Sequence, residues 1–90
     1  MDLIVSLENI EESFARVFPN PFDTELWIEF EKRTFCNYRL FDVHGKVWQS
    51  GKFESDTFKI NSEKLPYGIF ILSIQNENST RNYKVMRIKN

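Results

Sequence analysis

Apolar and polar residues alternate in short runs over most of the chain, a pattern typical of half-buried β-strands. Residues 24–30 show it most clearly, because Leu26, Ile28 and Phe30 fall on one side, while Trp27 and two glutamates fall on the other. Comparable runs predict further strands at residues 14–18, 38–41, 46–49, 57–60, 69–74 and 81–88. The run at 69–74 is apolar on both faces, so we expect a central strand that pairs with the last one.

Turn signals separate these runs. Residues 42–45 place Asp at the first and Gly at the fourth position, which is typical of a type I turn and lets Gly45 adopt a positive φ. Residues 65–68 follow the same logic, with Pro66 at the second position. Residues 50–51, Ser-Gly, are a weaker break and predict a β-bulge.

Two prolines, Pro19 and Pro21, flank Asn20 near the first predicted strand. Each proline removes a backbone N–H donor and disfavours helical geometry at the residue before it. The segment therefore predicts a bend without a helix, suited to a first strand that leaves one sheet edge to join another.

About seven short strands, with turn signals roughly every 8–12 residues and no long helix, predict an all-β fold. The specific expectation is a small antiparallel immunoglobulin-like β-sandwich with an aromatic-rich core. We place this domain at residues 14–90.

Residues 1–13 are ambiguous, because several apolar residues have helical spacing although an isolated helix of this length is marginal in water. We interpret them as a linker from an upstream domain. They lack the basic start and the long apolar stretch of a signal peptide, so an exported protein would carry its export signal elsewhere.

Composition supports one small folded domain, since the chain has 90 residues, is 41% hydrophobic and contains nine Phe. The net charge of −1 predicts no nucleic-acid partner, and no apolar run is long enough to cross a membrane. The charges are unevenly placed, however. Residues 1–31 carry eight acids and one base, and residues 79–90 carry four bases and no acid. Two interpretations stay open: solvated strand faces, or a charged tail that a receptor reads.

The candidate chemistry is sparse. Cys36 and His44 are the only Cys and His, so no disulfide, zinc motif or familiar triad is available. We interpret Cys36 as a small apolar filler and His44 as a turn residue, and we expect no enzyme activity, no metal and no cofactor.

Trp27 and Trp48 are the main alternative source of function. Trp27 lies on the polar side of its predicted strand, and an exposed aromatic on a sandwich could stack on a sugar ring or dock a partner. The simpler interpretation is that each Trp covers a sheet edge.

Three motifs occur in a fixed order along the chain. They are Phe18-Pro19-Asn20-Pro21, then Leu40-Phe41-Asp42 with Gly45-Lys46, then Leu65-Pro66 with Gly68-Ile69-Phe70. A basic-apolar ending follows at residues 84–89. Each motif alone is weak, but together and in this order they resemble the C-terminal sorting domain of type IX secretion in Bacteroidetes.

The resemblance implies a domain that directs attached cargo through the type IX translocon across the outer membrane. Cargo of this family passes through the periplasm and reaches the cell surface or the medium. A sortase-like peptidase usually removes the domain, and the resemblance places that cleavage within residues 1–13. The domain is then a passive substrate, with no membrane insertion of its own.

The terminal strand is where we expect the translocon to bind, because basic side chains at a chain end could add to a receptor sheet. The residues concerned are Lys84, Val85, Arg87, Ile88 and Lys89. An open terminal edge also predicts a weak homodimer of the isolated domain. The alternative function is an immunoglobulin-like carbohydrate-binding or adhesion module of a surface protein.

Overall fold

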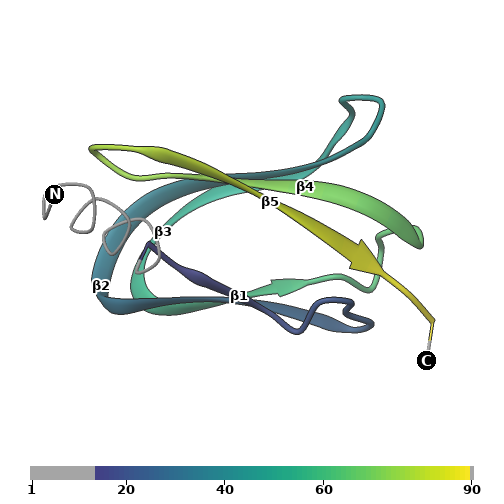
Figure 1. Cartoon of the computed structure of the whole chain (residues 1–90), viewed down its shortest axis with the longest axis horizontal. Helices are drawn as coiled ribbons and strands as arrows, with labels where there is room; N and C mark the ends of the chain where they lie inside the picture. The colour runs from purple at the N-terminus through teal and green to yellow at the C-terminus, as the bar shows by residue number, and fades with distance from the viewer. Residues whose placement is uncertain (1–13, 90) are drawn as a thin grey trace, which may run out of the picture.

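The computed structural model describes residues 14–89, and the expected linker at residues 1–13 lies outside them. Five strands form one curled antiparallel sheet (Figure 1). They are β1 (Arg16–Phe18), β2 (Glu25–Asp42), β3 (Val47–Asn61), β4 (Gly68–Gln75) and β5 (Thr80–Arg87).

Two long strands, β2 and β3, run through both layers of the domain. The first part of β2 pairs with β1 and with the end of β3, whereas the second part pairs with the start of β3 and with β4. We call the first group the β1 layer and the second group, extended by β5, the β5 layer; they lie at the bottom and top of Figure 1. Residues 31–34 contain neither Gly nor Pro, and the β2–β3 register shifts there, so the strand turns the corner without ending.

The all-β prediction is confirmed, but the expected seven short strands are wrong in number within the described residues. The predicted strands at 24–30 and 38–41 are parts of β2, and those at 46–49 and 57–60 are parts of β3. Each pair is continuous because the residues between them keep extended geometry.

The predicted bulge is also displaced. Residues 50–51 lie inside β3 without a break, and Gly51 faces the Tyr38 ring closely enough that an added Cβ would lie 3.1 Å from Cε1. The register shift falls instead next to Trp48, because Leu40 pairs with Gln49 and the next residue of β2 pairs with Val47. A larger residue at position 51 would therefore press against the Tyr38 ring.

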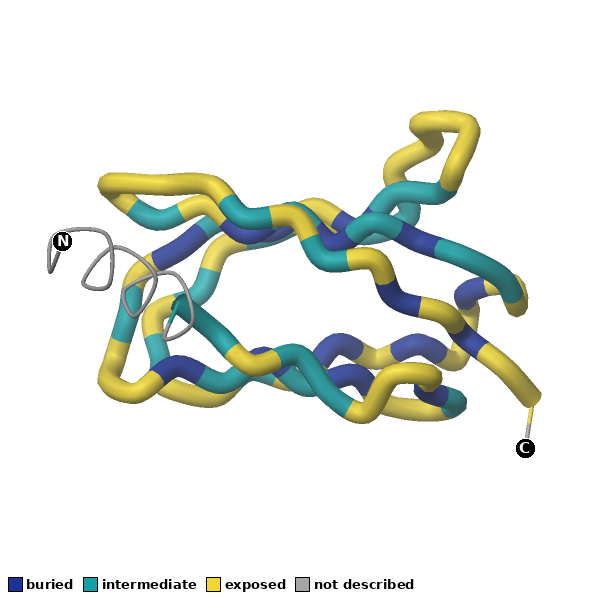
Figure 2. The backbone as a smooth tube through the Cα atoms, viewed as in Figure 1, coloured by how far each residue is buried: buried dark blue, intermediate teal, exposed yellow. Residues whose placement is uncertain are grey.

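The core lies between the two layers, and buried positions alternate with exposed ones along the strands (Figure 2). Aliphatic residues fill most of it, with Phe22 and Phe70 at the end that carries the motifs. Near the corner of β2 and β3 the core is aromatic, with Phe53 stacked on Phe58 at 4.2 Å between ring centroids. Full burial of one large side chain, as for Phe22 or Phe70, stabilises the fold by roughly 1.5–3 kcal/mol.

Candidate functional site

The Pro-Asn-Pro-Phe segment, residues 19–22, crosses from the β1 layer to the outer edge of β5. The side-chain amide of Asn20 bonds to the backbone of β5 as a neighbouring strand would. Its Nδ2 donates to the carbonyl of Lys84 at 3.0 Å, and its Oδ1 accepts from the N–H of Met86 at 3.1 Å. Phe22 continues the pairing through its backbone, accepting from the N–H of Ile88 at 2.8 Å and donating to the Met86 carbonyl at 2.9 Å. The predicted change of sheet edge is thus confirmed.

This contact corrects one expectation. The edge of β5 was predicted to be open along the basic ending, but residues 84–88 of that edge are covered by residues 20–22. The physical reason is that Asn20 carries both a donor and an acceptor, and so satisfies the edge where proline has no N–H to offer.

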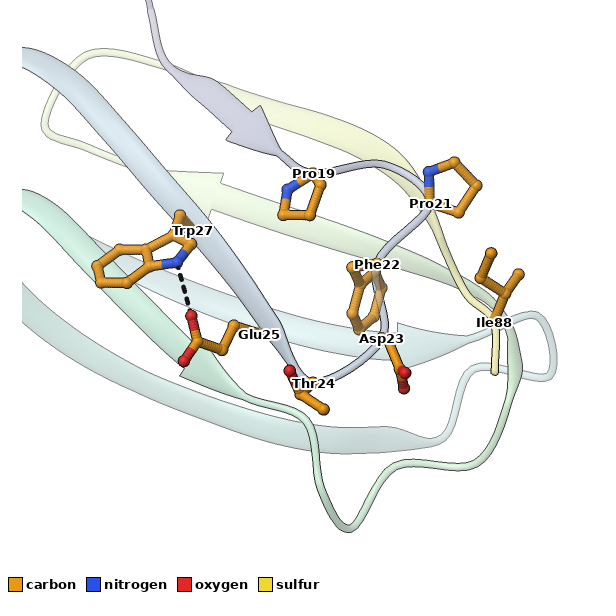
Figure 3. A pocket seen from close by; sticks show the side chains of 8 residues that line it. All are labelled: Pro19, Pro21, Phe22, Asp23, Thr24, Glu25, Trp27 and Ile88. Atoms are coloured by element: carbon orange, nitrogen blue, oxygen red, sulfur yellow. Dashed lines mark hydrogen bonds between the residues drawn. The ribbon is translucent and has the colours of Figure 1, made fainter. Parts of the chain in front are cut away.

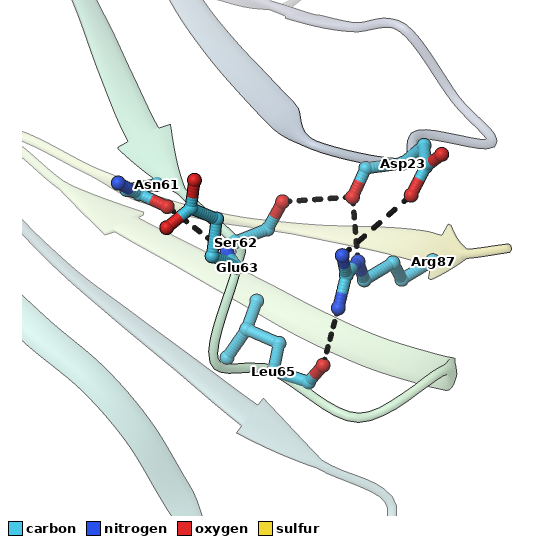
Figure 4. A network of polar contacts seen from close by, with 6 residues as sticks. All are labelled: Asp23, Asn61, Ser62, Glu63, Leu65 and Arg87. Atoms are coloured by element: carbon cyan, nitrogen blue, oxygen red, sulfur yellow. Dashed lines mark hydrogen bonds and ion pairs between the residues drawn. The ribbon is translucent and has the colours of Figure 1, made fainter. Parts of the chain in front are cut away.

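Arg87 joins Asp23, just beyond the first motif, to Leu65 of the third motif (Figure 4). Its side chain is buried and donates from Nε to the Asp23 carbonyl and from Nη1 to the Leu65 carbonyl. Nη2 lies 3.6 Å from Oδ1 of Asp23, and the guanidinium lies 4.6 Å from the centre of the Tyr67 ring. A buried guanidinium needs such partners, because an unpaired charge inside a protein is costly.

Ser62 completes this Arg87 network. Its hydroxyl donates to the Asp23 carbonyl at 2.9 Å, and its backbone N–H donates to the Thr24 carbonyl. The Ser62 carbonyl accepts from the N–H of Leu65 at 3.0 Å, so the hydrogen-bonded turn spans residues 62–65, three residues earlier than the turn expected at residues 65–68. Gly68 then opens β4 with φ 136°, a backbone conformation that favours glycine.

The second motif is held locally. The Asp42 carboxylate accepts from the backbone N–H groups of His44 at 2.8 Å and Lys46 at 3.0 Å, and from the Trp48 indole at 3.0 Å. These hydrogen bonds, led by that of Trp48, lower the pKa of the Asp42 carboxyl. The Gly45 N–H donates to the Asp42 carbonyl at 3.0 Å and Gly45 has φ 88°, so the predicted turn with positive φ at glycine is confirmed.

The five residues expected to meet the translocon fall into two groups. Val85 and Arg87 point into the domain and are 1% and 7% exposed. Lys84, Ile88 and Lys89 lie at the surface. Strand alternation separates the groups, because Val85 and Arg87 face the core that Phe70 and Leu65 also fill.

Trp27 lies beside a surface pocket of about 340 Å³ (Figure 3). The pocket is lined by Pro19, Pro21, Phe22, Asp23, Thr24, Glu25, Trp27 and Ile88. The Trp27 indole donates to Oε1 of Glu25 at 3.1 Å, and Nζ of Lys59 lies 6.0 Å from its ring centre. The indole N–H, which a ligand would use, is therefore already paired within the domain.

Trp48 is tied down more firmly. It is half-buried, its N–H is bonded to Asp42, and Nζ of Lys46 lies 4.0 Å from its ring centre. These contacts make it a part of the second motif and leave little ring face for a sugar.

Cys36 and His44 are not placed to cooperate. Cys36 is fully buried, and burial raises the pKa of its thiol to about 11, which keeps it protonated near neutral pH. His44 lies in the exposed turn that follows Asp42. The six residue steps from Cys36 to Asp42 along an extended strand correspond to about 20 Å. Within residues 14–89, no three His, Cys, Asp or Glu side chains are arranged to hold a metal ion.

The sequence prediction missed Asp23, Ser62 and Tyr67 as members of this site. Asp23 lies two residues after the first motif, and Tyr67 occupies the variable position of the third. A signal was present in Arg87 itself, since a lone base at a core-facing position of an alternating strand requires a partner.

The domain is thus a small curled β-sheet in which two sequence motifs that lie far apart converge on the last strand. The family of secretion system C-terminal sorting domains matches residues 16–89, and the chain belongs to this family. This confirms the type IX sorting-domain family that the motifs indicated.

One solved structure supports the fold. It comes from work on PorZ, described as an essential bacterial surface component of the type IX secretion system of human oral-microbiomic Porphyromonas gingivalis. It is similar to this chain with a TM-score of 0.71 and 14% identity, over 83% of this chain and 11% of that chain. The chain therefore corresponds to about a tenth of that protein, and the likeness concerns the fold. No curated protein matches the chain. Within the described part of the chain, no helix is long and apolar enough to span a bilayer.

Proposed function

We propose that this domain directs an attached protein through the type IX translocon across the outer membrane, from the periplasm to the cell surface or the medium. Family membership over residues 16–89 is the observation that carries this proposal. The contacts support it, because the first and third motifs hold β5 in one position. A recognition signal needs a fixed shape, and the role requires no catalytic group.

Three finer points belong to the same proposal. The two-layered sheet corresponds to an immunoglobulin-like sandwich if each half of β2 and β3 counts as a strand. The domain is a passive substrate of a sortase-like peptidase that cleaves within residues 1–13, and residues 14–90 form the sorting domain. Recognition at the chain end uses the exposed residues Lys84, Ile88 and Lys89, while Val85 and Arg87 hold the strand in place.

The burial of Val85 and Arg87 changes how the proposal is tested. Deleting residues 84–90 would remove core side chains along with exposed ones, so lost export would not separate recognition from folding. A fluorescent protein with a periplasmic export signal should carry residues 1–90 at its C-terminus in a bacterium that has a type IX system. A second version of this fusion should carry Lys84→Gln, Ile88→Ser and Lys89→Gln.

We expect the unchanged fusion to reach the surface or the medium, and the triple variant to stay in the periplasm while unfolding at a similar temperature. An unchanged fusion that stays in the periplasm would contradict the sorting role. Glycan binding that depends on Trp27 would then favour the carbohydrate-binding alternative, for which Trp27→Ala is the decisive variant.

A further inference from the structure

The outer face of the β5 layer combines unpaired cations with apolar side chains. Cys36, Tyr38 and Leu40 point into the core, so the residues between and after them on β2 point outward. The strand register then defines the outer face: Lys52 on β3; Asn37, Arg39 and Phe41 on β2; Ile69, Ile71, Ser73 and Gln75 on β4; Lys84 and Met86 on β5.

The apolar part of this face is continuous across four strands. Phe41 lies directly opposite Val47 on one side and Ile71 on the other, and Ile69 lies opposite Met86 in the next row. Val47 is 45% exposed and Met86 is 36% exposed, so the patch reaches solvent. A contiguous exposed apolar patch on a small protein commonly marks an interaction site.

The charged part of the face consists of Arg39, Lys52 and Lys84. Within residues 14–89, no carboxylate lies within ion-pair distance of Arg39, Lys52 or Lys84. The β1 layer differs, because on its outer face Arg16 pairs with Glu29 at 2.9 Å and Lys59 lies 3.7 Å from Glu25. Three uncompensated positive charges on one face are therefore available to an acidic partner.

A small hollow of about 180 Å³ lies in the same face, between β2 and β4. It is lined by Asn37, Tyr38, Arg39, Ser73 and Gln75. Oδ1 of Asn37 is buried and has no hydrogen-bond partner among the described residues. A buried acceptor without a donor is costly, and a donor supplied by a partner would satisfy it.

We propose that the outer face of the β5 layer is a docking surface for a partner protein whose own surface has carboxylates around an apolar centre. The inference rests on the proposed function and deepens it, because it extends the recognition surface from the chain end across β4 and β2. The cations would steer association and fix orientation, and the apolar row would supply contact area.

Two other occupants fit less well. Phe41, Ile69 and Ile71 are half-buried among their neighbours on the sheet, so they do not project into a bilayer as the apolar face of an interfacial helix does. A second copy would have to offer its acidic β1 layer, whose glutamates are already paired, and such head-to-tail contacts do not close into a dimer.

The test uses the same fluorescent fusion with changes away from the chain end. One variant carries Arg39→Glu and Lys52→Glu. Its control carries Lys32→Glu and Lys64→Glu, which change the net charge of the chain by the same amount at positions outside this face. A second variant carries Phe41→Thr and Ile71→Thr, matched by Phe14→Thr with Val43→Thr, which lie outside the apolar row. Thermal unfolding of each purified chain shows whether the fold is retained.

We expect each face variant to lower the exported fraction about tenfold, a change typical of losing a few contacts at the centre of an interface, while the matched controls export normally. Normal export of both face variants, beside normal export of the unchanged fusion, overturns this inference and leaves the sorting role intact. Failure of the unchanged fusion overturns the sorting role and this inference with it.

Sedimentation with phosphatidylglycerol vesicles distinguishes the lipid alternative. We expect the unchanged chain to remain in the supernatant. Binding that Arg39→Glu with Lys52→Glu abolishes would overturn the protein partner in favour of an anionic membrane surface.

Discussion

The turn at residues 42–46 and the loop at residues 62–68 each connect two strands and carry a sequence motif, yet they are held in different ways. Asp42 satisfies its turn from within, through bonds to residues two, four and six positions along the chain. The loop at 62–68 depends on Arg87, whose partner Leu65 is 22 residues away. The first turn can form in an isolated hairpin, whereas the second needs the last strand.

The largest effect is expected from Arg87→Met, which tests the dependence of the loop on the last strand. It removes the side-chain donor of the Leu65 carbonyl and one of the two donors of the Asp23 carbonyl, which keeps its bond from Ser62. It also removes the buried ion-pair partner of Asp23. We expect a loss of about 3 kcal/mol in the free energy of unfolding, measured by urea denaturation. Lys89→Met, at the surface of the same chain end, should change it by less than about 0.5 kcal/mol. Equal effects of the two substitutions would show that the Arg87 network contributes little.

A smaller effect is expected from alanine at the two turn glycines. Gly68 has φ 136° and Gly45 has φ 88°, and in both cases an added Cβ would meet nothing within 4 Å. Backbone strain alone therefore decides the outcome. We expect a loss of about 2 kcal/mol for Gly68→Ala and about 1 kcal/mol for Gly45→Ala, since φ 88° lies nearer the left-handed helical region that alanine can enter. Thermal unfolding of both variants gives the order, and a reversed order would contradict this account.

Asn20→Ala should have a moderate effect that is confined to the edge of β5. The substitution removes two exposed hydrogen bonds to β5, for a loss of about 1 kcal/mol. Amide hydrogen exchange provides the specific measurement, because the Met86 N–H should exchange faster while the amides of β4 keep their protection. Unchanged protection of Met86 would mean that Asn20 does not cover this edge.

The smallest effect concerns the pH dependence of the self-contained turn. Because the folded-state pKa of Asp42 is lowered, the carboxylate adds stability above its unfolded pKa, about 3.9, and that contribution is lost as the pH falls through the folded value. Asp42→Asn should therefore be less stable than the unchanged chain at pH 7, and the difference should shrink below about pH 4. Urea denaturation across this range measures it. A difference that is constant with pH would exclude the charge as the cause.

Local patterns were sufficient to predict much of the fold. Alternation identified the strands, and the Asp42–Gly45 spacing identified a turn whose bonds are all local. The family followed from the order of three motifs. The number of strands could not be predicted in this way, because polar residues at 31–34 resemble a loop although they continue β2 around a corner.

The candidate site was harder to predict because its contacts are distant in sequence. Asn20 bonds to Lys84 and Met86, which lie 64 and 66 positions further along the chain. Arg87 and its partner Asp23 are also 64 positions apart. Nothing in the local composition of residues 84–89 distinguishes Arg87, which is buried, from Lys84, which is exposed. Only the alternation of the strand separates them, and the side that faces the core depends on partners elsewhere in the chain.

The pairing of Asn20 and Phe22 with residues 84–88 also sets an order in time. As a ribosome releases the chain, residues 19–22 emerge long before their hydrogen-bond partners exist. A nascent or truncated product that stops before residue 84 lacks every one of these contacts, as well as Arg87. The domain can therefore close only after residues 84–88 have been synthesised. A translocon that binds only the closed domain would reject incomplete chains without recognising any particular sequence in them.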